Sequence, residues 1–193
     1  MKTNFFIIAL LFAAQASTDA RIGETSDELV RRYGKPTFTK AAKDGQPEIC
    51  AFHFNHFDIT VCLLNGRSAS ETFIETSPVK QGNGTYANAI SMTISDTSKD
   101  MVLGANSRGK RWERIGSLNW FGEQWDVGSE HPIDKSKLLN AWKLAGERIF
   151  CAESRRSMPA GFCELRLFTQ EYSDVIAPLV QKERENEVKK SGL

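Results

Sequence analysis

The chain has 193 residues, of which 40% are hydrophobic and 25% are charged, and its formal net charge is +1. This balance is typical of a globular chain and excludes an intrinsically disordered one. Because the charge is close to zero, no overall basic field favours nucleic acid or an anionic membrane surface as a partner.

Residues 1–20 have the pattern of a secretory signal peptide. Lys2 supplies a positive start, the apolar run Phe5–Ala14 follows, and the small residues at the end of that run form a cleavage site. The run is too short to span a bilayer, and no later stretch is long and apolar enough for a transmembrane span. We therefore expect an exported protein, periplasmic or secreted, with its signal peptide cleaved after Ala16 or Ala20.

The segment 21–76 begins with the signals of a short helix. Thr25 or Ser26 can cap the start of this helix through a side-chain oxygen. Gly34 suits the residue after its last turn, and Pro36 prevents the helix from resuming. A short helix therefore opens this first unit.

A three-stranded antiparallel sheet is predicted after this helix. Apolar residues alternate over two runs that are separated by Asn55-His56, a dipeptide suited to a tight turn. Asn65-Gly66 predicts a second turn, and Ser68–Ile74 reads as the third strand. The helix can cover one face of this sheet, which would make 21–76 a folding unit.

A second, enlarged unit is predicted over residues 95–177. The segment 77–94 contains a proline and two glycines and reads as a linker, and a new helix begins at Ser95. Strands are expected at 138–145, 147–154 and 162–169, and a charged helical tail at 178–193. The cap and apolar positions of the two helices match, which indicates a duplication, although two short capped helices can also be alike by chance. The predicted fold class is α+β, with two tandem helix-plus-antiparallel-sheet units.

Two short patterns carry a family resemblance. Arg21–Thr25 reads Arg-Ile-Gly-Glu-Thr, and Arg32–Pro36 reads Arg-Tyr-Gly-Lys-Pro. With the hairpin that follows, they resemble the helix-to-sheet junction of BamE/SmpA-like envelope proteins and, still more, uncharacterised exported bacterial proteins with the same start. The duplication also resembles the architecture of β-lactamase-inhibitor proteins. BamE proteins are lipid-anchored, whereas this chain lacks the cysteine that would directly follow the apolar run of a lipoprotein signal.

The four cysteines form two pairs with the same spacing of twelve residues. Disulfides are the default expectation in an exported chain, and no Cys-x-x-Cys pair indicates redox chemistry. Strand alternation places Cys151 and Cys163 on one face, but it places Cys50 inward and Cys62 outward. A duplication favours one bridge in each unit. We expect the bridges Cys151–Cys163 and Cys50–Cys62.

No motif for catalysis, a cofactor or a metal is present in the sequence. The three histidines lack the spacing of a zinc site, and His53 is expected to face Asp58 across the hairpin. Aromatic residues concentrated in the enlarged part of the second unit are candidates for a protein-binding surface, the alternative being that they complete its core. These candidates are Trp112, Trp120, Phe121 and Trp125.

The function expected from the sequence is that of an exported, non-enzymatic protein-interaction module of the bacterial envelope or periplasm, with an unknown protein or envelope component as partner. The alternatives are a periplasmic hydrolase-type enzyme and a purely structural envelope protein. An enzyme should present a deep pocket with convergent polar groups, whereas a binding protein should present an exposed apolar patch.

The export prediction is tested on the protein isolated from its source organism. Intact-mass analysis should find an N-terminus that begins after Ala16 or Ala20, because signal peptidase cuts after small residues. A mature protein that retains residues 1–16 would contradict the prediction.

Overall fold

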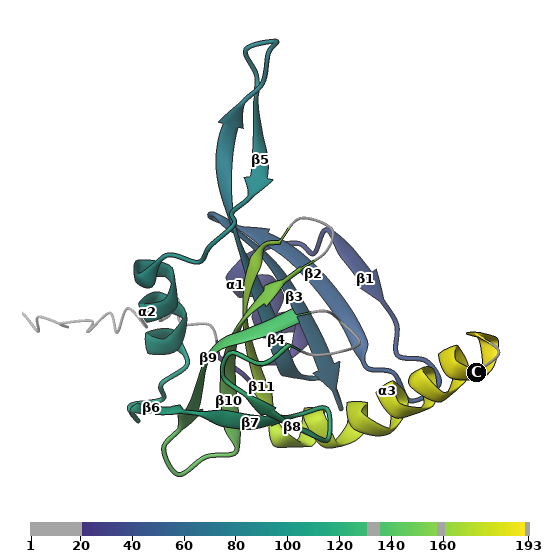
Figure 1. The fold of residues 1–193 in the computed structure, drawn as a ribbon. Coiled ribbons are helices and arrows are strands. Elements are labelled where there is room, and N and C mark those ends of the chain that lie inside the picture. The colour runs from purple at the N-terminus through teal and green to yellow at the C-terminus, as the bar shows by residue number, and fades with distance from the viewer. Residues whose placement is uncertain (1–20, 131–135, 158–160, 192–193) are drawn as a thin grey trace, which may run out of the picture.

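The computed structural model describes residues 21–130, 136–157 and 161–191. Within these residues, nine strands form one antiparallel sheet, called here the main sheet (Figure 1). Its strand order is β1-β2-β3-β4-β11-β10-β9-β6, and β5 pairs with the far end of β4. A separate hairpin consists of β7 and β8, and three helices flank the main sheet.

The elements have the following bounds: α1 Ser26–Tyr33, β1 Phe38–Lys40, β2 Glu48–Phe54, β3 Phe57–Leu64, β4 Arg67–Lys80, β5 Tyr86–Ile90, α2 Asp96–Ala105, β6 Trp112–Ile115, β7 Ser117–Trp120, β8 Glu123–Asp126, β9 Ser136–Leu144, β10 Ile149–Arg156, β11 Cys163–Thr169 and α3 Gln170–Ser191. None of the helices in the described part of the chain combines the length and the apolar character needed to cross a membrane.

The local signals at the start of the chain are confirmed. The side chain of Thr25 accepts a hydrogen bond from the backbone of Glu28, whose carboxylate accepts one from the backbone of Thr25, so a capping box begins α1. Gly34 has φ of 87° and ends the helix. Asn55 and Asn65 have φ of 54° and 52°, the left-handed conformation that tight turns between strands require.

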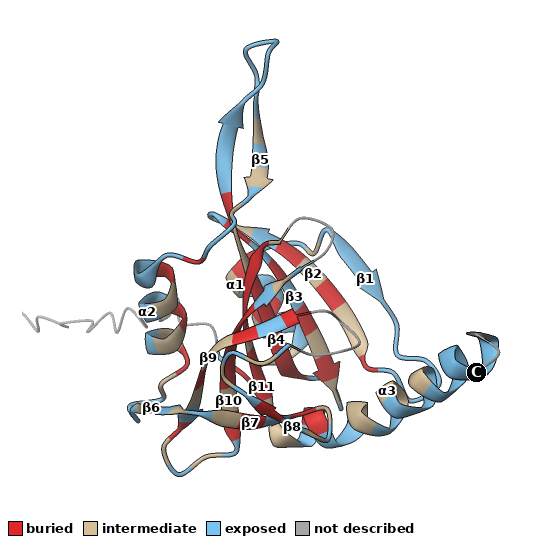
Figure 2. Cartoon of the chain, in the orientation of Figure 1, coloured by how far each residue is buried: buried red, intermediate tan, exposed pale blue. Residues whose placement is uncertain are grey.

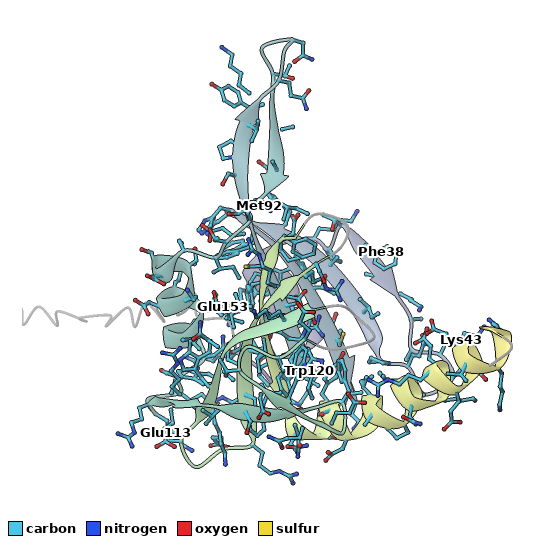
Figure 3. All side chains as sticks on the ribbon, viewed as in Figure 1. Phe38, Lys43, Met92, Glu113, Trp120 and Glu153 are labelled. Atoms are coloured by element: carbon cyan, nitrogen blue, oxygen red, sulfur yellow. The ribbon has the colours of Figure 1, made fainter. Side chains whose placement is uncertain are left out.

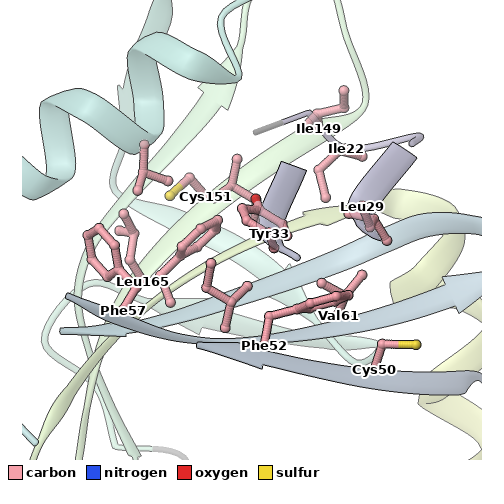
Figure 4. Close-up of a cluster of buried hydrophobic side chains, with 14 of the residues drawn as sticks. Ile22, Leu29, Tyr33, Cys50, Phe52, Phe57, Val61, Ile149, Cys151 and Leu165 are labelled. Carbon is pink, nitrogen blue, oxygen red and sulfur yellow. The ribbon is translucent and has the colours of Figure 1, made fainter. Parts of the chain in front are cut away.

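Two hydrophobic clusters lie on opposite faces of the main sheet. Helices α1 and α2 cover one face, where Leu29, Tyr33 and Val102 pack with apolar side chains from β2, β3, β10 and β11 (Figure 4). The β7–β8 hairpin and the start of α3 cover the other face, over residues such as Leu138 and Phe168. Strand alternation sends neighbouring residues into different clusters, so both faces are part of the core.

The predicted fold class is wrong. Instead of two tandem units, a single main sheet runs through both halves of the chain, because β4 pairs with β11 as well as with β3. The register aligns Leu165 with Phe73 and Leu167 with Glu71. Each predicted unit would have left an unpaired strand edge, and pairing β4 with β11 removes both edges at once. The structure is therefore mostly β.

Two of the predicted segments also differ in the structure. Half of the expected linker 77–94 is strand, since β4 continues to Lys80 and β5 returns alongside it. The expected tail is part of α3, which begins at Gln170 and contains Pro178. Residues 1–20, the predicted signal peptide, lie outside the described residues.

One carboxyl group is enclosed between α1 and the main sheet. Glu71 on β4 is fully buried, and the hydroxyl of Tyr33 donates a hydrogen bond to its Oε2 atom at 3.3 Å. Burial raises the pKa of Glu71 from 4.5 to about 7, and the nearby carboxylate of Glu24 acts in the same direction. Glu24 itself forms an ion pair with Arg32.

This buried carboxyl should make stability depend on pH. The folded state binds more protons than the unfolded state between pH 4.5 and about 7, so the free energy of unfolding should fall as pH rises through that range. Replacing Glu71 with Gln should remove this dependence and stabilise the protein at pH 8 by roughly 3 kcal/mol. Urea titrations at pH 5 and pH 8 measure the effect.

The control for this experiment is Glu183→Gln, on the exposed outer half of α3. The free energy of unfolding of this variant should equal that of the wild type at both pH values. An unchanged pH dependence in Glu71→Gln would show that Glu71 is ionised at no free-energy cost in the folded state.

Candidate protein-interaction site

The aromatic residues proposed as a binding surface are largely inside the protein. Trp120 and Trp125 are only 2% and 4% exposed, and their rings lie 4.9 Å apart, centroid to centroid. Trp120 also contacts Phe168 edge-on at 5.2 Å, while the guanidinium of Arg166 lies over the Trp120 ring. Figure 3 places Trp120 among the elements of the lower part of the molecule. These residues anchor the β7–β8 hairpin to the main sheet.

The other two aromatic candidates are half-buried and also have structural contacts. The indole of Trp112 donates a hydrogen bond to the carbonyl of Leu103 at 2.7 Å, which ties β6 to α2. Phe121 occupies the turn between β7 and β8 with φ of 50°, and its backbone N–H bonds the Ser173 hydroxyl at 3.1 Å. The four aromatic side chains therefore complete the core and do not form an exposed patch.

The structure brings together neither of the expected cysteine pairs, and all four thiols are free. Cys163 lies opposite Arg155, four positions along β10 from Cys151, which corresponds to about 13 Å and exceeds the roughly 7 Å limit between bridged Cα atoms. Cys50 and Cys62 are in adjacent strands, but they point to opposite faces of the main sheet. The equal spacing reflects two hairpins of similar length.

The histidines and carboxylates form local pairs. His53 lies opposite Asp58, as predicted, with Nδ1 at 2.8 Å from the carboxylate. Among the described residues, no group of three or more histidine, cysteine, aspartate or glutamate side chains is placed to hold a metal. Burial raises the pKa of the Cys62 thiol, and the hydroxyl of Tyr172 donates a hydrogen bond to its Sγ atom at 3.6 Å. This thiol is protonated at neutral pH, which is unfavourable for nucleophilic chemistry.

A surface notch of about 620 Å³ lies between the first described residues and the end of α2. Two of the arginines that line it hold backbone carbonyls: Arg67 donates to the carbonyl of Gly23 at 2.8 Å, and Arg108 donates to that of Ile22. These bonds attach the segment before α1 to the main body. These two arginines of the notch therefore serve to hold the chain in place.

A two-stranded hairpin, largely exposed to solvent, projects from the main sheet. We call residues 76–90 the β4–β5 arm; it consists of the outer end of β4, a turn, and β5 (Figure 1). Figure 2 shows it exposed along nearly its whole length. At its tip, the Asn83 side chain accepts hydrogen bonds from the backbone and hydroxyl of Thr85, at 3.1 and 2.7 Å, which orders the turn.

The arm and its base carry apolar side chains in contact with solvent. Val79 is 50% exposed, Tyr86 71% and Ile90 46%, and Met92 just after β5 is 51% exposed (Figure 3). Residues 76–90 include one lysine and no acidic residue. Apart from Lys80 the arm is uncharged, and exposed apolar side chains with little charge around them are typical of the core of an interface.

Hydrogen bonds at its base fix the direction of the arm. Glu75 accepts a bond from the backbone of Ser95, the cap of α2, at 2.7 Å. The backbone N–H of Thr76 donates to the carbonyl of His56 at 2.7 Å, and the amide of Asn88 lies 3.1 Å from Nε2 of His53. The arm is thereby attached to both α2 and the β2–β3 turn. It projects as a supported element of the structure.

Sequence reasoning missed this site because Pro78, Gly82 and Gly84 favour a linker. A usable signal was present: short runs with strand-forming residues stand on either side of the Gly-Asn-Gly turn. Whether such a hairpin lies on a core or projects from it depends on which strands are neighbours, and the sequence pattern alone does not contain that information.

No family model matches the chain, and no curated protein matches it. Among solved structures, the chain is similar to a crystal structure of a cysteine-rich secretory protein from Staphylococcus aureus subsp. aureus Mu50, with 12% sequence identity and a TM-score of 0.41. The match covers 78% of this chain and 45% of that chain, so the chain spans less than half the length of that structure.

The family resemblance predicted from the sequence is wrong. One main sheet runs through both halves of the chain, which differs from the tandem units expected of BamE/SmpA-like and β-lactamase-inhibitor-like proteins. The patterns at Arg21–Thr25 and Arg32–Pro36 are explained by the capped helix α1 and its stop at Gly34.

The state of the thiols gives a direct test of the cysteine geometry. Without reduction, mass analysis of denatured protein treated with iodoacetamide should show four alkylated cysteines, because none is bridged. In the folded protein only Cys62, which borders a groove beside α3, should react. Its raised pKa should make labelling slow at pH 7.5 and faster as pH rises.

The control is Cys62→Ser, which should remove the labelling of the folded protein. Two unreactive pairs in the denatured, unreduced protein would instead establish the disulfides.

Proposed function

We propose that this chain is an exported, non-enzymatic protein-interaction module that contacts its partner through the β4–β5 arm. The observation that carries the proposal is the arm itself, a supported hairpin with Val79, Tyr86 and Ile90 in solvent. Exposed apolar area of this kind is costly for an isolated protein, and burying it against a partner recovers that free energy.

The shape of the arm also supports a binding role. A two-stranded hairpin is only marginally stable by itself, so an arm that leaves the core gains order when a partner covers it. Tyr86 is the best anchor, since tyrosine offers a large apolar ring with a polar tip at low entropic cost. The core beneath the arm positions it through Glu75 and His56.

The test is photo-crosslinking in the source organism. A photoreactive phenylalanine analogue at position 86 should give a discrete crosslinked product, because Tyr86 is at the proposed contact. The same analogue at Phe38, which is 55% exposed on β1 and away from the arm, is the matched control and should give none (Figure 3).

A shortened arm completes the experiment. Thr76 and Ile90 are directly opposite each other, so residues 77–89 can be replaced by an Asn-Gly turn without disturbing the main sheet. This variant should keep its near-ultraviolet circular dichroism and lose the complex that position 86 identifies. A crosslink at position 38 with none at position 86 would place the binding surface elsewhere and refute the proposal.

A further inference from the structure

The two long edges of the arm are not equivalent. The backbone N–H of Ser91 donates to the carbonyl of Glu75, and that of Gln81 donates to the carbonyl of Thr85. The odd-numbered residues of β4 therefore direct their backbone N–H and C=O groups toward β5. Successive residues of a strand direct their backbone groups to opposite edges. The even-numbered residues of β5 therefore present their N–H and C=O groups outward. These residues are Tyr86, Asn88 and Ile90.

The edge formed by β4 is closed to further pairing. The N–H of Thr76 is already bonded to His56, and Pro78, the next residue that faces this edge, has no N–H. Lys80 follows with a charged side chain, another feature that discourages strand addition. By contrast β5 contains no proline and no charged residue, so its outer edge is open.

The sequence of β5 is close to symmetric about Asn88. An alanine stands on each side of it, and Tyr86 and Ile90 stand two positions away. If two β5 strands pair antiparallel about a two-fold axis, Asn88 lies opposite its counterpart and Tyr86 lies opposite Ile90 of the second copy. These would be hydrogen-bonded pairs, since all three residues direct their backbone groups outward. The aromatic and β-branched side chains then meet twice across the axis, a favourable cross-strand combination.

We propose that two copies of this chain associate through the outer edges of β5, forming an intermolecular sheet in the order β4-β5-β5-β4. The inference rests on the proposed function of the arm and names its partner as a second copy. No like charges oppose the contact, because the single lysine of each arm is on the distant strand. The arm projects well beyond the main sheet, which leaves space between the two bodies (Figure 1).

Asn88→Pro is the direct test. This change removes an outward N–H at the centre of the edge without removing a bond between β4 and β5. In sedimentation velocity of the mature chain over a wide concentration range, the wild type should shift from the monomer mass to twice that mass. Asn88→Pro should raise the dimer dissociation constant at least about tenfold.

Phe38→Ser is the control. It removes an exposed apolar side chain from β1, away from the arm, and it should leave the dissociation constant unchanged.

Crosslinking tests the two-fold geometry separately. With Asn88→Cys, a short bis-maleimide should join two chains in high yield, because the symmetric pair brings the two side chains within about 5.5 Å of each other. Val79→Cys should give little product. Equal crosslinking of both variants would contradict the pairing.

The two proposals fail differently. A wild-type chain that stays monomeric while position 86 crosslinks to a different protein would overturn the second copy as partner and leave the arm as the binding element. Dimerisation that persists in the variant lacking residues 77–89 would overturn the β5 pairing. Absence of both dimer and crosslink would overturn both proposals.

Discussion

Strand β4 sets the constraint on which the remaining structure depends, because it is 14 residues long and the backbone groups of its buried part need partners on both edges. Residues 70–73 are paired with β3 on one edge and with β11 on the other. Beyond Glu75 both neighbours stop, at the turn before Phe57 and at Cys163. The strand nevertheless continues, and β5 supplies its pairing there. The continuous sheet and the projecting arm are thus two consequences of one strand.

Joining the two halves at β4 and β11 also decides what the helices and the aromatic residues do. Both α1 and α2 lie on one face, so the opposite face needs a separate cover. The β7–β8 hairpin and α3 provide it, with Trp120 and Trp125 as the largest side chains of that second cluster. The aromatic residues that the sequence suggested for binding are therefore packed in the core. Exposed apolar side chains lie on the arm instead.

Local chemistry was predictable because its causes lie within a few residues. The capping box of Thr25 and Glu28, the stop at Gly34 and the turn at Asn55 each depend on neighbours in sequence. The alternation of β2 and β3 likewise gave the correct register of His53 with Asp58. The pairing of β4 with β11 joins residues almost a hundred positions apart, and no periodicity records it. The disulfide expectation failed for the same reason, since it assumed a register that brings Cys151 to Cys163.

By itself, the sequence determined the capped helices, the strand hairpins and their inward faces, because hydrogen-bond caps, turn conformations and side-chain alternation are local properties of the chain. Only the tertiary structure decided that these hairpins share one sheet, that Glu71 is enclosed, and that residues 76–90 project into solvent. Those outcomes depend on which strand edges meet. Strand edges pair in the arrangement that buries the apolar side chains of both sheet faces at once. This depends on the whole chain and is not encoded in any one segment.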